Sequence, residues 1–237
     1  MADGPRQLPL ALPFRAAFGA EDFLVSRANE AAVAFVEQWP TWPAPAVLIY
    51  GAAGCGKSHL VSVWRARSGG SVLSGADLTE EVVANLGDGA ALAVDDIDRE
   101  LKDERALFHL LNHARESQCT VLLTSRCAPG ALSARIPDLR SRLRALPGAE
   151  ISAPDDALLR ALLVKLFSDR QLQVEPLVVS YILRHMERSA EAANDIVARI
   201  DRRSLADRRR VTRILAGQVL ADRIAEADGG PPQQQRD

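Results

Sequence analysis

The sequence holds 237 residues, of which 47% are hydrophobic and 25% are charged, proportions typical of a folded protein with one large domain or two small ones. Its 29 basic and 31 acidic side chains give a net charge of −2, which argues against a protein that coats nucleic acid or an anionic membrane. The three cysteines stand at unrelated spacings, and no stretch approaches the roughly 18 apolar residues of a membrane span. These features predict a cytoplasmic protein that does not cross a membrane.

Short apolar runs alternate with helical patterns over the first 152 residues. Such alternation predicts a parallel sheet of five strands with helices on both faces. The expected strands are residues 46–50, 71–73, 90–94, 120–124 and 149–152, and the expected helices are residues 58–67, 77–86, 103–116 and 139–145.

After Pro154 the apolar residues recur only at helical spacing. Four helices are expected there, over residues 155–170, 175–188, 190–204 and 207–225. The chain is therefore predicted to consist of an extended segment (1–18), an α/β domain (19–152), a small all-helical domain (153–225) and a disordered tail (226–237).

Residues 51–58 read Gly-Ala-Ala-Gly-Cys-Gly-Lys-Ser and fit the phosphate-loop pattern G-x-x-x-x-G-K-[ST] without a mismatch. The motif follows an expected strand and opens an expected helix, which is the context that it requires. Its glycines let backbone N–H groups turn toward phosphate oxygens, while Lys57 reaches the β- and γ-phosphates and Ser58 binds Mg²⁺. The predicted nucleotide-binding residues here are Gly51, Gly54, Cys55, Gly56, Lys57, Ser58 and His59.

Two carboxylates, Asp95 and Asp96, end the apolar strand that follows about forty residues later. Alone, this pattern is more typical of a strand that ends in an acidic turn, but the phosphate loop at this spacing favours a functional interpretation. Asp95 is then expected to hold Mg²⁺ together with Ser58, and Asp96 to orient an attacking water. Because Asp96 is shorter than the glutamate usual in fast ATPases, any intrinsic ATPase activity is expected to be weak.

The next strand ends in Thr124-Ser125-Arg126, and Ser125 is a candidate contact of the γ-phosphate. An ordinary strand end explains this hydroxyl nearly as well. Further along, a short helix carries Arg140, Arg142 and Arg144, which suit either a developing phosphate charge or a solvated basic surface.

Two other groups of residues leave alternatives open. Trp39 and Trp42 either wedge the loop before the first sheet strand or stack near an adenine base. The arginines of residues 199–213 form either a nucleic-acid contact or, since Asp201 and Asp207 interrupt them, a solvated or protein-contacting face.

Taken together, these motifs resemble an AAA+ nucleotide-binding module followed by a helical lid, and within that class the Hda family of DnaA-related regulators. The segments that carry the resemblance are residues 23–29, 51–60, 94–97 and 137–143. The resemblance implies a protein that binds ADP or ATP with Mg²⁺, contacts the initiator DnaA and stimulates hydrolysis of the ATP that DnaA holds, thereby limiting re-initiation. Arg142 matches the family's arginine finger, with Arg140 second in rank.

The N-terminal Gln7-Leu8-Pro9-Leu10 is similar to the family's docking motif for the sliding clamp, the β subunit of the replicative polymerase. Leu8 and Leu10 would fill an apolar groove while Gln7 supplies hydrogen bonds. The alternative is a proline-rich segment held on the domain's own core.

No direct sequence-specific DNA binding is expected, because the two domains leave no residues for a DNA-reading domain. A homodimer is left open.

Two departures from the family pattern concern the γ-phosphate. Arg126 stands where DnaA has an acidic residue, and Glu191 stands where the lid is expected to supply a nucleotide-contacting arginine. Arg188 would substitute only with a register shift of one turn. A diphosphate-binding regulator is consistent with both departures.

The alternative function is a helicase-loader-like AAA+ ATPase that binds single-stranded DNA and a replicative helicase.

Overall fold

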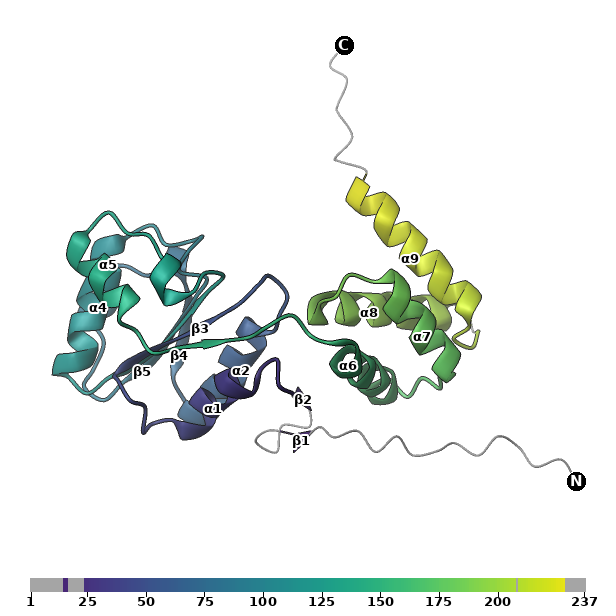
Figure 1. Ribbon diagram of the computed structural model, residues 1–237, viewed down its shortest axis with the longest axis horizontal. Coiled ribbons are helices and arrows are strands. Elements are labelled where there is room, and N and C mark those ends of the chain that lie inside the picture. Colours follow the sequence, from purple (N-terminus) through teal and green to yellow (C-terminus); the bar gives the residue numbers. More distant parts are fainter. Residues whose placement is uncertain (1–14, 17–23, 208, 229–237) are drawn as a thin grey trace, which may run out of the picture.

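The computed structural model describes residues 15–16, 24–207 and 209–228 of the chain (Figure 1). An α/β part comes first, and a group of helices follows it. The predicted clamp-docking residues Gln7, Leu8 and Leu10 lie outside the described residues. Two short antiparallel strands, β1 (Arg15–Ala16) and β2 (Leu24–Val25), precede the main sheet.

The main sheet has five parallel strands in the order β4-β5-β6-β3-β7, which confirms the predicted fold class. All five strands run the same way, so their carboxyl ends share one edge of the sheet. At that edge Tyr50 pairs in register with Ser125, and Ser74 with Asp95. The strands are β3 (Ala46–Tyr50), β4 (Ser71–Ser74), β5 (Ala91–Asp95), β6 (Thr120–Ser125) and β7 (Gly148–Glu150).

Helices cover both faces of this sheet (Figure 1). The central strand β3 is buried on both sides, since Val47, Leu48 and Ile49 are each fully inaccessible, which explains its unbroken apolar run. On one face lie α1 (Glu30–Gln38) and α2 (Lys57–Ser68), and on the other lie α3 (Glu80–Ala84), α4 (Glu104–Glu116) and α5 (Pro137–Arg144).

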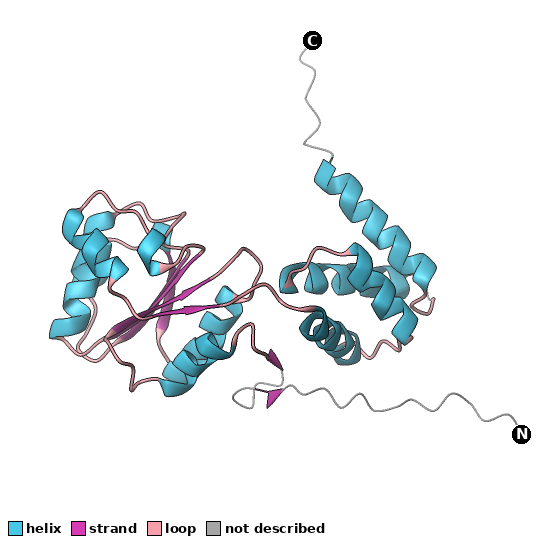
Figure 2. Cartoon of the chain, viewed as in Figure 1, coloured by secondary structure: helices cyan, strands magenta, loops and turns pink. Residues whose placement is uncertain are grey.

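The helical part forms a hydrophobic core of its own, drawn from all four of its helices. Figure 2 shows no strand within it, and its described residues contain none. Asp155 begins the first helix by accepting a hydrogen bond from the backbone N–H of Leu158, the acidic start that the sequence indicated. The helices are α6 (Asp156–Asp169), α7 (Pro176–His185), α8 (Ala190–Asp207) and α9 (Arg213–Asp228).

Several boundaries differ from the prediction. Helix α1 was not predicted, although its buried residues Ala32, Val33 and Val36 follow helical spacing. The helix expected over residues 77–86 is a 3₁₀ turn followed by the five-residue α3, and α9 continues to Asp228, beyond its expected end at 225. Element ends of this kind depend on capping and packing, which periodicity alone does not determine.

The two tryptophans before β3 confirm the wedge interpretation. The indole N–H of Trp39 donates to Thr120 Oγ1 (3.0 Å), and that of Trp42 donates to the carbonyl of Phe35 (2.6 Å). Both rings pack against the fully buried Trp64, one edge-on and one stacked. Thr120 begins β6, so this cluster lies at the amino-terminal edge of the sheet, away from the phosphate loop. None of the helices described is long and apolar enough to cross a membrane.

Candidate nucleotide site

The phosphate loop connects the carboxyl end of β3 to the start of α2. Gly54 and Gly56 have φ values of 68° and 110°, conformations that a residue with a side chain adopts only with strain. At Gly51 a Cβ atom would lie 2.2 Å from the carbonyl oxygen of Ile151, so no side chain fits there. The backbone of the loop therefore requires glycine at residues 51, 54 and 56, of which the motif itself fixes only 51 and 56.

The Lys57 side chain points back over the loop. Its Nζ atom donates to the carbonyl oxygens of Gly51 (2.8 Å) and Ala52 (3.0 Å), and the residue is only 6% exposed. Among the described residues no carboxylate forms an ion pair with it. A buried ammonium group without an anion is costly, and a phosphate would supply that anion. The residues of the loop thus fit a nucleotide phosphate.

Asp95 and Ser58 lie side by side at the end of β5. Ser58 Oγ is 2.7 Å from Asp95 Oδ2, and Thr124 Oγ1 donates to Asp95 Oδ1. Thr124 also accepts a hydrogen bond from the backbone N–H of Asp96 at 2.9 Å. A hydroxyl and a carboxylate oxygen in contact beside a phosphate loop are the donor set that Mg²⁺ uses in such sites. The residues predicted to hold the metal therefore fit it.

Asp96 stands in an uncommon backbone conformation, with a φ of 53°. Its N–H bonds to Thr124, and the carbonyl of Thr124 accepts from the N–H of Ile97 at 3.0 Å. Two hydrogen bonds to one residue thus hold the turn after Asp95. A non-glycine residue in this region is strained, and such strain often marks a functional site.

Thr124 is the residue of this site that sequence reasoning missed. The predicted contact was Ser125, whose buried hydroxyl instead accepts from the N–H of Cys127 at 2.8 Å. A nucleotide contact of Ser125 stays a prediction. The sequence did carry a signal for Thr124, because a hydroxyl residue in an otherwise apolar strand requires a partner. Periodicity does not tell which of two adjacent hydroxyls faces the neighbouring carboxylate.

The helical part, α6 to α9, is the predicted lid, and it contacts the phosphate loop directly at Gly54. The backbone N–H of Ala190, the first residue of α8, donates to the carbonyl oxygen of Gly54 at 3.2 Å. A Cβ atom on Gly54 would lie 3.1 Å from Glu191 Oε2 and 3.2 Å from Ser189 Cβ. The lid therefore presents a carboxylate, and not a guanidinium, beside the loop. Arg188, the substitute considered from the sequence, pairs with Asp156 at 2.5 Å.

The other two residues predicted around the loop differ in environment. Cys55 is half-buried, and burial raises the pKa of its thiol while the nearby Lys57 ammonium opposes that rise. The thiol is therefore uncharged at neutral pH. His59 is exposed on the first turn of α2. Neither observation tests a contact with nucleotide.

Arg142 lies far from this chain's own phosphate loop. It is half-buried, with its guanidinium carbon 5.0 Å from the centre of the Phe108 ring, whereas Arg140 is exposed. It lines a cavity of about 260 Å³ together with Pro45 and Ala46 at the start of β3. The phosphate loop follows the other end of that five-residue strand, roughly 15 Å away. Arg142 is therefore not placed to act on a nucleotide in its own site.

Several arginines of the lid are neutralised by carboxylates of the lid itself. Arg199 bonds to Asp195 and Glu226, each at 2.8 Å, and Arg203 pairs with Asp222. These pairs favour a solvated, internally paired surface over a nucleic-acid contact for this part of residues 199–213.

Comparison with known proteins agrees with this architecture. Residues 155–220 match the family model described as Hda, lid domain. The chromosomal replication initiator protein DnaA of Cutibacterium acnes is 25% identical to the chain, over 89% of the chain and 47% of that protein. The chain thus spans about half the length of this curated relative.

Solved structures show the same fold. Domain III of the Thermotoga maritima replication initiation protein DnaA superimposes with a TM-score of 0.73 at 18% identity, covering 85% of this chain and 95% of that one. DnaA from Aquifex aeolicus, bound to AMPPCP, gives 0.62 at 19% identity, covering 78% and 68%. The Holliday junction branch migration motor RuvB of Thermotoga maritima gives 0.63 at 20%, covering 82% and 66%. The lid match, the DnaA relative and the shared fold together support a relationship of this chain to the Hda and DnaA-related AAA+ family.

Proposed function

We propose that this protein is a negative regulator of DNA replication initiation, a nucleotide-bound AAA+ adaptor that docks on the sliding clamp and stimulates ATP hydrolysis by DnaA. The observation that carries the proposal is the combination of an Hda-type lid with Arg142 at the sheet edge opposite its own phosphate loop. From that place an arginine could contact a nucleotide only if another molecule holds it. Stabilising charge in a partner's site is how such arginines accelerate phosphoryl transfer, by about 10³–10⁵-fold.

The resident ligand in this proposal is a nucleoside diphosphate with Mg²⁺. Lys57 would bind the phosphates, and Ser58 and Asp95 would hold the metal, which supplies charge neutralisation when bound. Support for a diphosphate over a triphosphate comes from Glu191, whose carboxylate lies against Gly54 of the loop. The extra negative charge of a γ-phosphate beside it is unfavourable.

Intrinsic ATP hydrolysis in this account is slow. Asp96 is the candidate that would orient water, but its side chain is short and its backbone is held by Thr124. With a carboxylate at residue 191 of the lid and Arg188 paired to Asp156, no lid arginine is placed to stabilise the γ-phosphate among the described residues of that segment. The protein would therefore act through DnaA's hydrolysis rather than its own.

Docking on the clamp is assigned to Gln7, Leu8 and Leu10 on the strength of the sequence motif alone. The proposed site of action is the clamp on DNA in the cytoplasm, and a homodimer is an open part of the proposal. The helicase-loader alternative differs in needing single-stranded DNA and a helicase, and the family match of the lid favours the regulator.

The test measures hydrolysis of DnaA-bound ATP in the presence of clamp loaded on DNA, with and without this protein. The proposal expects faster hydrolysis that requires both the clamp and the protein, and that a Gln7→Ala/Leu8→Ala double variant abolishes. Clamp pull-down with the same variant should show lost binding. Unchanged DnaA hydrolysis, together with binding to single-stranded DNA and to a replicative helicase, would favour the loader instead.

A further inference from the structure

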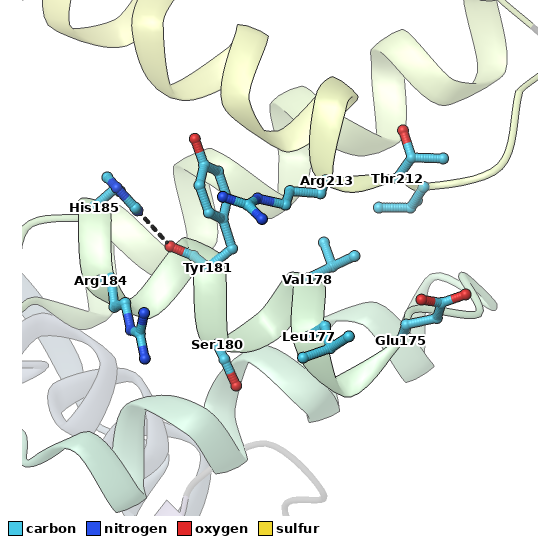
Figure 3. Close-up of a pocket in the computed structure, with 10 residues that line it drawn as sticks. Glu175, Leu177, Val178, Ser180, Tyr181, Arg184, His185, Thr212 and Arg213 are labelled. Atoms are coloured by element: carbon cyan, nitrogen blue, oxygen red, sulfur yellow. Dashed lines mark hydrogen bonds between the residues drawn. The ribbon is translucent and has the colours of Figure 1, made fainter. Parts of the chain in front are cut away.

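A cavity of about 350 Å³ opens on the lid, between α7 and the segment that leads into α9 (Figure 3). Val178 and Val211 are nearly buried, at 3% and 7% exposed, and Tyr181 contributes an aromatic wall. The volume lies within the usual range of ligand sites, about 300–1,000 Å³. The cavity therefore has room for a large apolar side chain.

The rim of this cavity carries positive charge that the lid does not neutralise. Arg184 and Arg213 line it together with one carboxylate, Glu175, so the rim carries a net positive charge, and within the described part of the chain neither arginine forms an ion pair. Arg213 instead lies over the ring of Tyr181, with its guanidinium carbon 4.7 Å from the ring centre (Figure 3). Five other lid arginines do form ion pairs, namely Arg170, Arg188, Arg199, Arg203 and Arg223.

Exposed apolar side chains also lie at the rim of this cavity and beside it. Leu177 on the rim is 76% exposed, and Ile214, which follows Arg213 in the first turn of α9, is 75% exposed. These are the highest values among the large hydrophobic residues that the structure describes. Apolar groups in water beside a concave surface and a polar rim are typical of a protein-binding site.

We propose that this cavity and its rim dock an acidic segment of a partner protein. One large apolar side chain of the segment fills the cavity against Val178 and Tyr181, and the flanking carboxylates pair with Arg184 and Arg213. The unpaired guanidinium groups supply the charge complementarity, and Leu177 adds apolar contact at the edge. Arg142 lies in the α/β part, so this surface is separate from the contact assigned above to DnaA's nucleotide.

A protein segment fits this surface better than single-stranded nucleic acid does. Nucleic-acid sites of that kind offer free aromatic faces on which bases stack. Here Arg213 covers the ring of Tyr181, and the ring of His185 lies 4.4 Å from it. The exposed Leu177 and Ile214 offer apolar contact, which suits a protein side chain better than a phosphate backbone.

The test begins with selection of a random-peptide display library on the full-length protein. We expect enriched peptides that combine Asp or Glu with a large apolar residue. A labelled synthetic copy of the best peptide is then titrated into the wild type, Arg184→Glu and Leu177→Ala. Each change should weaken binding at least about 10-fold, because it reverses a paired charge or removes apolar contact. Arg202→Glu, an exposed arginine of α8, is the matched control and should bind normally.

Charge reversal in the peptide keeps the test decisive. Replacing its acidic residues with lysine should abolish binding to the wild type and restore binding to Arg184→Glu. Unchanged melting temperatures would show that the variants are folded. A selection without acidic, apolar peptides, equal binding of the peptide to Arg184→Glu, or competition of the peptide by a single-stranded oligonucleotide would each overturn the proposal.

Discussion

Ser58 Oγ lies 2.7 Å from Asp95 Oδ2, although the two residues stand 37 positions apart in the chain. The contact follows from the parallel sheet, because the loop after β3 and the end of β5 both lie at its carboxyl edge. Thr124 on the intervening strand β6 holds the other carboxylate oxygen. The predicted metal-binding pair is thus assembled by three strands.

Replacing Asp95 with asparagine should weaken nucleotide binding only when Mg²⁺ is present. The change removes the charge that holds the metal but leaves Lys57 and the loop intact, so an affinity loss of about 10-fold or more is expected with Mg²⁺. Titration of a fluorescent nucleotide with and without EDTA measures it. Asp88→Asn, at an exposed loop carboxylate, is the control and should have no effect. An equal loss in EDTA would mean that Asp95 supports the fold rather than the metal.

Changing Glu191 to glutamine should improve ATP binding relative to ADP. The carboxylate lies against the phosphate loop at Gly54, and two like charges about 4 Å apart in water repel by ~1 kcal/mol, or about 5-fold in affinity. Competition titrations with both nucleotides measure the ratio. Glu187→Gln removes a carboxylate that faces Arg223 instead and should leave the ratio unchanged. If the wild type already binds both nucleotides equally, Glu191 does not discriminate between them.

Substituting alanine at Gly54 should destabilise the protein more than the same change at Gly89. Both glycines have nearly the same φ, 68° and 70°, so the backbone strain of about 1–2 kcal/mol is common to the two variants. Only at Gly54 does the new methyl group meet the lid, at Ser189 and Glu191; around Gly89 there is open space. Urea denaturation measures the difference. Equal losses would show that the lid contact contributes nothing.

Acid should weaken the α8–α9 pairing through Asp195. Hydrogen bonds from Arg199 lower the pKa of this carboxyl below its usual value, with Arg223 adding a second donor. A lowered folded-state pKa means that the stabilisation is present above the unfolded pKa, about 3.9, and is lost as pH falls through the folded value. The side chain is 35% exposed, so the contribution is below about 1 kcal/mol. Asp195→Asn should therefore show a smaller decrease in melting temperature between pH 5 and pH 3 than the wild type.

The sequence predicted the parts of the site that depend on local pattern. The loop from Gly51 to Ser58 needs glycines for its backbone and a lysine for its charge, so its motif identifies it wherever it occurs. Asp95 followed from an apolar strand that ends in carboxylates. The order of strands in the sheet then brought these two segments together, which a parallel α/β fold requires.

Contacts between distant residues were not predictable in the same way. Thr124 and Ser125 are both small hydroxyl residues, and only the strand's orientation decides which one meets Asp95. The approach of Glu191 to Gly54 depends on how the lid sits on the α/β part, which no local pattern records. The role of Arg142 could be assigned from its sequence motif. That it lies far from the chain's own phosphate loop could be seen only once the fold was known.

The measurement that tests the central claim most directly is hydrolysis of DnaA-bound ATP with clamp on DNA, compared between Arg142→Ala and Arg140→Ala. Both arginines lie on α5, and only Arg142 matches the finger position. The account predicts at least about 100-fold loss of the stimulation for Arg142→Ala and near-normal stimulation for Arg140→Ala. Full stimulation by a folded Arg142→Ala protein would contradict it.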